Sequence, residues 1–130
     1  MRYFLIACTV LISGVGGCAA LQPHHEQIEH VVIIWLKEPG NAQARQQLID
    51  RSYEFTKIPG ITNVVAGPML PSDRKTVDST YDVGVVMTFK DAKSLREYDK
   101  HPIHQQAVKE VLAPLASRYI AYDFVEEGKH

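Results

Sequence analysis

The sequence YDVGVVMTFKDAKSLREYDKHPIH, at residues 81–104, is the stretch from which the fold can be worked out. Its first nine residues alternate between two faces, as the side chains of a β-strand do. One of these faces is apolar throughout and consists of Tyr81, Val83, Val85, Met87 and Phe89. We therefore expect a strand at 81–89 that buries this face in the core.

The second half of the stretch changes to the period of a helix. Asp91 can cap the N-terminus of this helix, and apolar residues three positions apart, ending at Tyr98, share one face. Pro102 disfavours helical geometry in His101, so the chain turns there, and a new helix can begin at Pro102 with His104 in its first turn. We expect Tyr98 and the two histidines to meet at the edge of a cavity.

The periodicity of the remaining chain predicts strands at 28–37, 61–70 and 119–125, helices at 41–56 and 102–118, and an exposed loop at 71–78. The first of these strands is apolar on both faces, which is typical of a strand buried on both sides. Asn41 can cap the first helix. Gly67-Pro68 predicts a bulge or a sheet edge in the second strand, and Pro114 should kink or loosen the last helix.

This order of elements predicts an α+β fold. It is a ferredoxin-like sandwich, in which a four-stranded antiparallel sheet carries helices on one face. The other face of the sheet is too apolar for water, because it presents Val31, Ile33, Trp35, Gly84 and Val86. We therefore expect a partner on that face, and a second copy of the chain is the first candidate.

Residues 1–17 have the features of a bacterial lipoprotein signal peptide. Arg2 precedes a long apolar run that ends in Val15-Gly16-Gly17-Cys18, which resembles a lipobox. We expect cleavage before Cys18, a lipid on Cys18 that anchors the protein to a membrane, and a tether at 18–27. The alternative interpretation is an uncleaved transmembrane helix near 3–21.

The lipoprotein interpretation places the protein in the bacterial cell envelope. Ala19 rather than Asp follows Cys18, which resembles the pattern of lipoproteins sorted to the periplasmic side of an outer membrane. The chain's two cysteines are Cys8, in the signal peptide, and Cys18, so we expect no disulfide framework. The formal net charge of -1 and the scattered basic residues argue against nucleic acid as a partner. The charged tail at 126–130 is expected to fray.

Several motifs together resemble the stress-responsive A/B barrel family, known as Dabb. They are HVVIIWLK at 30–37, IPGI at 58–61, the strand and HPIH corner of 81–104, and YDF at 122–124. The resemblance covers residues 28–125 and implies one domain there. It also implies that the sheets of two subunits pack face to face into a dimeric α/β barrel, so that the protein is a homodimer.

His104 and Tyr98 are the candidate catalytic residues. A neutral imidazole at the mouth of an apolar pocket can accept a proton, and a tyrosine hydroxyl beside it can stabilise developing charge. The resemblance implies the same roles, because in a plant polyketide cyclase of the family the last histidine of Y-x-x-H-P-x-H is the general base and the tyrosine assists an aldol-type ring closure. The alternative is a surface histidine next to an ordinary half-buried aromatic residue.

We expect the ligand to contact residues on the inner face of two strands, namely His30, Val32, Ile34, Val85 and Met87. His30 has the alternative role of bonding a helix end. Arg51 and Val83 stand where the plant cyclase has a pocket tyrosine and a histidine, so a polyketide substrate is not implied. His101 is expected to cap or pack, and we expect neither a metal site nor a cofactor.

These observations support three hypotheses. The first is an envelope lipoprotein whose dimeric domain binds a small, largely apolar molecule, with or without cofactor-free cyclase-like or lyase-like activity. The second is a non-catalytic stress or scaffold protein of the envelope. The third, from related dimeric barrels, is a small monooxygenase.

Overall fold

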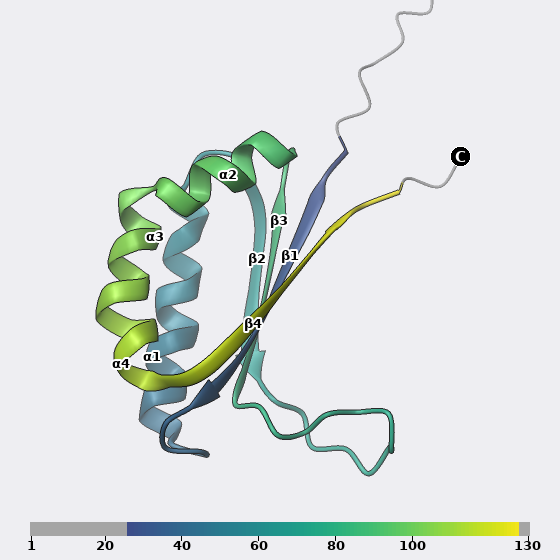
Figure 1. Ribbon diagram of the computed structural model, residues 1–130, viewed down its shortest axis with the longest axis vertical. Helices are drawn as coiled ribbons and strands as arrows, with labels where there is room; N and C mark the ends of the chain where they lie inside the picture. Colours follow the sequence, from purple (N-terminus) through teal and green to yellow (C-terminus); the bar gives the residue numbers. More distant parts are fainter. Residues whose placement is uncertain (1–25, 128–130) are drawn as a thin grey trace, which may run out of the picture.

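The computed structural model describes residues 26–127, which form a sheet layer and a helical layer (Figure 1). The strands are β1 (Ile28–Leu36), β2 (Ile61–Pro68), β3 (Val83–Phe89) and β4 (Ala116–Val125). The helices are α1 (Ala42–Tyr53), α2 (Ala92–Lys100), α3 (Pro102–Ala107) and α4 (Ala113–Leu115), with a 3-10 turn η1 (Glu54–Lys57) and a π-helical turn η2 (Val108–Leu112). The signal peptide, Cys18 and the tether up to residue 25 lie outside the described residues.

The sheet is antiparallel, with strand order β2-β3-β1-β4, and all helices lie on one of its faces (Figure 1). This confirms the predicted ferredoxin-like fold. β1 lies at the centre, paired with β3 on one side and β4 on the other, as expected for a strand that is apolar on both faces. β2 is an edge strand that ends at Pro68, which fits a residue without a backbone donor.

The core lies between the sheet and the helices. The inner face of β3 is almost inaccessible to solvent, since Val83, Val85, Met87 and Phe89 are at most 2% exposed. Leu48 of α1 and Tyr98 of α2 cover it from the helical layer and are also buried. The face that the sequence assigned to the core is therefore buried along β3. Tyr81 is the exception and was wrongly assigned to this face: it precedes β3, and its ring packs against that of Trp35, with the centroids 6.4 Å apart.

The helices begin where their capping residues predict. The Asn41 side chain accepts a hydrogen bond from the Ala44 amide at 3.0 Å, and the Asp91 side chain accepts one from the Ser94 amide at 2.7 Å. His101 ends α2 and caps α3, because its Nδ1 atom accepts a hydrogen bond from the Ile103 amide at 3.3 Å. This confirms the capping role expected for His101.

The predicted helix at 102–118 is too long. The helical segment ends at Leu115 and β4 already begins at Ala116, opposite Leu36 of β1. The Lys37 amide donates to the Leu115 carbonyl at 2.8 Å, so pairing with β1 takes over as soon as the helix ends. The helix is loosened as expected from Pro114, in the turn that precedes this proline. There the Ala113 amide donates to the Val108 carbonyl, which makes the turn π-helical.

Among residues 26–127, no helix is both long and apolar enough to span a membrane.

Candidate functional site

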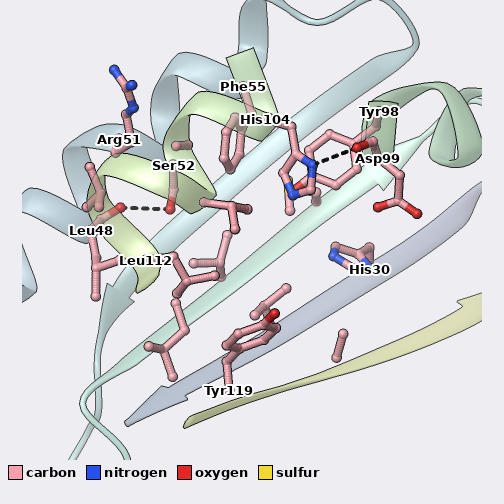
Figure 2. A pocket seen from close by; sticks show the side chains of 18 of the residues that line it. His30, Leu48, Arg51, Ser52, Phe55, Tyr98, Asp99, His104, Leu112 and Tyr119 are labelled. Carbon is pink, nitrogen blue, oxygen red and sulfur yellow. Dashed lines mark hydrogen bonds between the residues drawn. The ribbon is translucent and has the colours of Figure 1, made fainter. Parts of the chain in front are cut away.

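A cavity of about 310 Å³ lies between the sheet and the helical layer (Figure 2). It is lined by all seven residues that the sequence singled out for catalysis or ligand contact: His30, Val32, Ile34, Val85, Met87, Tyr98 and His104. They come from β1, β3, α2 and α3, which are far apart in the sequence. The fold therefore brings the whole set together around one space.

The remaining lining residues were not predicted as site residues: Leu48, Arg51, Ser52, Phe55, Asp99, Gln105, Ala107, Val108, Val111, Leu112, Tyr119 and Ala121. Several of them belong to the apolar stripes of the two long helical segments, and helical period alone assigns such stripes to the core. Tyr119 and Ala121 lie opposite Ile34 and Val32 in the pairing of β4 with β1. That register is set by the tertiary structure, so the sequence pattern could not single these two residues out.

Tyr98 is at the centre of an aromatic cluster. Its ring centroid lies 4.1 Å from that of His104, 5.2 Å from Phe89 and 5.5 Å from Phe55. The side chain is 3% exposed. Burial, with a smaller contribution from the Asp99 charge, raises the pKa of the Tyr98 hydroxyl above its usual range. The hydroxyl therefore stays protonated at physiological pH and can donate a hydrogen bond.

His104 has one nitrogen fixed by the backbone. Its Nδ1 atom lies 3.3 Å from the Asp99 carbonyl oxygen, and a carbonyl can only accept a hydrogen bond. In the neutral ring Nδ1 therefore carries the proton, and Nε2 keeps a free lone pair. Burial lowers the pKa of His104, although the Asp99 carbonyl and charge oppose this effect. Near neutral pH the imidazole is a neutral base at the cavity wall (Figure 2).

His30 is paired with a carboxylate that the sequence did not single out. Its Nδ1 atom lies 2.5 Å from Oδ1 of Asp123, which is directly opposite in the pairing of β1 with β4. The His30 ring centroid is 5.8 Å from that of Tyr98. His30 thus lies at the cavity, and its partner is a strand residue, so the alternative of a bond to a helix end is wrong.

Arg51 contributes its side-chain stem to the cavity, while its guanidinium points away from it (Figure 2). The two terminal nitrogens each lie 3.0 Å from a carboxylate oxygen, one of Glu54 and one of Glu110. This ion-pair network joins α1 to the π-helical turn η2. Within residues 26–127, no three His, Cys, Asp or Glu side chains gather in a way that could hold a metal ion.

These features define a class of protein: a ferredoxin-like α+β domain with an aromatic and histidine-lined cavity between sheet and helices. The model of the stress responsive A/B barrel domain, Dabb, matches residues 28–126. The chain belongs to this family, as the sequence motifs predicted. Comparison with curated protein sequences gave no match.

Three solved structures illustrate the likeness. A Dabb family protein with a ferredoxin-like fold from Mesorhizobium loti is 25% identical, with a TM-score of 0.63 over 79% of this chain and 99% of that one. A dimeric ferredoxin-like protein of unknown function from Thermobifida fusca is 22% identical, with a TM-score of 0.64 over 82% and 97%. A hydroxynitrile lyase from Passiflora edulis is 15% identical, with a TM-score of 0.67 over 82% and 98%.

Proposed function

We propose that the chain is an envelope lipoprotein whose Dabb domain dimerises, binds a small, largely apolar molecule and carries out cofactor-free acid–base chemistry on it. This proposal rests mainly on one observation: in the cavity wall, the ring centroids of His104 and Tyr98 lie 4.1 Å apart. One ring offers a proton acceptor and the other a proton donor, in the wall of a largely apolar cavity.

The size and lining of the cavity support a small, mostly apolar ligand. Its volume of about 310 Å³ is near the lower end of ligand pockets, which run from about 300 to 1,000 Å³. Apolar side chains of the strands and helices, including Phe55 and two alanines, form most of its wall. The rings of His30 and His104 both lie close to Tyr98, with centroids 5.8 and 4.1 Å from its own, and such a group of polar side chains can orient a ligand rather than merely enclose it.

The geometry suits removal of a proton next to a carbonyl group. Nε2 of His104 takes the proton as the C–H bond breaks, and the electron pair moves onto the carbonyl oxygen as an enolate. The Tyr98 hydroxyl donates a hydrogen bond to that oxygen. The presence of a hydroxynitrile lyase among proteins of the same fold is consistent with lyase-type chemistry on this scaffold.

Hydrogen–deuterium exchange into a simple ketone tests this step before the natural substrate is known. The full chain in detergent is incubated in D₂O with 4-phenyl-2-butanone, and loss of the proton signals next to the carbonyl is followed by NMR. We expect exchange above the micelle blank, with His104→Ala slowing it by about 10²–10⁴-fold. Equal exchange by His104→Ala and by the unchanged chain would leave the cavity a binding site without catalysis.

Tyr98→Phe separates catalysis from packing. It keeps the ring in the aromatic cluster and removes the donor, so we expect slower exchange with little change in folding stability. A scaffold role for this domain predicts instead that neither variant changes anything except, slightly, stability.

A homodimer is supported by the outer face of the sheet. Large apolar side chains that are 41–55% exposed gather there from β2 and β4: Val65, Ile120, Tyr122 and Phe124. Half-buried Val31, Ile33, Trp35 and Val86 continue the same face across β1 and β3. Exposed apolar areas of this kind mark interfaces, and proteins of the same fold are described as dimeric. We propose that a second copy covers this face, which forms a dimeric α/β barrel.

The membrane anchor rests on the sequence of residues 1–18, with its lipobox-like end at Cys18. The family domain begins at residue 28, so a short tether separates the lipid from the sheet. We propose an outer-membrane location facing the periplasm. Metabolic labelling with an alkyne fatty acid, followed by membrane fractionation, tests this. Labelling that persists in Cys18→Ser would contradict the anchor.

A further inference from the structure

We infer that the cavity selects uncharged carbonyl compounds and rejects carboxylates. This inference rests on the proposed ligand-binding function and adds a rule about ligand charge. It comes from the charged groups around the cavity: among the described residues, the one arginine or lysine in its lining is already paired with carboxylates.

The guanidinium of Arg51 is the first place to look for such a cation, because no other lysine or arginine lines the cavity among the described residues. Its terminal nitrogens are already bonded at 3.0 Å to Glu54 and to Glu110. Its Nε atom has no hydrogen-bond partner among the described residues, but it is buried and out of reach of solvent. A ligand carboxylate could bind a terminal nitrogen only by displacing Glu54 or Glu110 from it.

The opposite end of the cavity carries negative charge. Asp99 lines it next to Tyr98, and its charge acts on the nearby His104. Asp123 approaches from β4, with its carboxylate 2.5 Å from His30 and a side chain that is 52% exposed. A carboxylate placed at the His104 and Tyr98 corner would therefore meet like charge.

The interior adds a second barrier, which applies to a charge of either sign. Any ionised group that enters must lose its hydration, and it finds there an apolar wall, a protonated tyrosine hydroxyl and a histidine whose pKa is lowered. An uncharged carbonyl avoids both costs and can accept the hydrogen bond that Tyr98 offers. An ammonium group is attracted to the rim carboxylates, but it must also be desolvated to pass them.

Three compounds with the same phenylpropyl body test this rule: 4-phenyl-2-butanone, 3-phenylpropanoate and 3-phenylpropylamine. Each is titrated calorimetrically into the full chain in detergent, with a micelle-only blank, at pH 7.5 and low ionic strength. We expect the ketone to bind at least tenfold more tightly than the carboxylate or the amine. Raising the salt concentration should reduce the difference in affinity between the ketone and the carboxylate, because salt screens exposed charges.

The outcomes separate the two proposals. A carboxylate or an amine that binds as tightly as the ketone overturns the charge rule and leaves ligand binding in place. If neither these three compounds nor fatty alcohols of different length give a binding signal in the calorimeter, the proposed ligand-binding function itself is contradicted.

Charge-removing variants supply the sharper test. Glu110→Gln releases one nitrogen of Arg51, and Asp99→Asn removes the carboxylate beside His104 while keeping the backbone carbonyl that holds its ring. We expect the double variant to bind 3-phenylpropanoate at least threefold more tightly. Glu97→Gln is the matched control, because Glu97 is a 62% exposed carboxylate that pairs with Lys93 away from the cavity. If the double variant and the control bind the carboxylate equally, the rim charges do not select the ligand.

Discussion

Nδ1 of His30 lies 2.5 Å from Oδ1 of Asp123, across the neighbouring strands β1 and β4. An ionised carboxylate can only accept a hydrogen bond, so this contact places a proton on Nδ1 of His30 and leaves Nε2 as the acceptor of the neutral ring. His104 is held in the same tautomer by the Asp99 carbonyl. In the neutral form of each cavity histidine, the proton is therefore on Nδ1. The Asp123 carboxylate fixes it in His30, and the Asp99 backbone carbonyl fixes it in His104.

Replacing Asp123 with Asn should release His30 from this single tautomer. The amide can donate or accept, so Nδ1 need no longer carry the proton. We expect the imidazole ¹⁵N shifts of His30 to move toward a mixture of tautomers, measured by long-range ¹H–¹⁵N NMR. Because Asp123 is half exposed, the free energy of unfolding should fall by only about 0–1 kcal/mol. Asp73→Asn, in the exposed loop, is the control and should leave the His30 shifts unchanged. If Asp123→Asn also leaves them unchanged, Asp123 does not fix the tautomer of His30.

The stability of the fold should decrease in acid because of His104. Burial lowers the pKa of His104 below its ordinary value of 6.5, so the unfolded chain takes up a proton at a higher pH than the folded chain does. The free energy of unfolding should therefore fall as the pH drops below 6.5, until the folded ring is protonated as well. Above that pH the ring is neutral in both states and contributes no pH dependence.

Urea denaturation of the chain and of His104→Gln, at pH 7.5 and pH 5.5, measures this effect. The variant should lose less stability between the two pH values than the unchanged chain. The exchange activity proposed above should likewise persist to a lower pH than that of a base with the ordinary histidine pKa of 6.5, because burial lowers the pKa of His104. Equal pH slopes for the two chains would mean that His104 is not desolvated.

Gly60 should not tolerate a side chain. Its φ angle is +91°, and a Cβ atom there would lie 2.5 Å from both Cβ and Oγ of Ser94, which is 1% exposed. The backbone strain alone costs about 1–3 kcal/mol, and the clash adds to it. We expect Gly60→Ala to lower the urea midpoint markedly. Gly67→Ala is the control, since a Cβ at Gly67 meets nothing within 4 Å, and a comparable loss there would refute the steric explanation.

The outer sheet face should govern self-association. Tyr122 lies opposite Val31 on that face and is 55% exposed, so Tyr122→Glu should cost the isolated subunit little. In a face-to-face dimer it would bury a charge, and we expect the variant to be monomeric by native mass spectrometry. Leu70→Glu is the matched control, because Leu70 is 80% exposed and lies beyond the end of β2. If the Tyr122→Glu variant is still dimeric, the dimer interface does not include this face of the sheet.

Features that depend on neighbours in the sequence were predictable in detail. The alternation in residues 81–89 identified the buried face of β3, and the polar side chains of Asn41 and Asp91 marked the starts of α1 and α2. The histidine before Pro102 was recognised as a cap for the same reason. Each of these signals acts over one turn or one strand, so the sequence contains all that it needs.

The site residues were also accessible to this kind of reasoning when they lay on such elements. His30 and His104 each point toward the core side of a predictable strand or helix, and both line the cavity. What periodicity cannot distinguish is a core position from a cavity position. Helical period alone would place Leu48, Phe55 and Leu112 in the core, yet in the structure they line an open space between the helical layer and the sheet.

The sequence by itself thus determined the fold class, the inner face of the sheet and the identity of the histidine and tyrosine corner, because hydrophobic period and capping are local. The tertiary structure alone decided that Asp123 pairs with His30, 93 residues away, that Arg51 is neutralised by Glu110, and that the last helix stops at Leu115. These features follow from strand register and from how the layers pack, and a shift of one residue in register would move Asp123 to the other face of the sheet. Such long-range pairings leave no mark in the local pattern of residues.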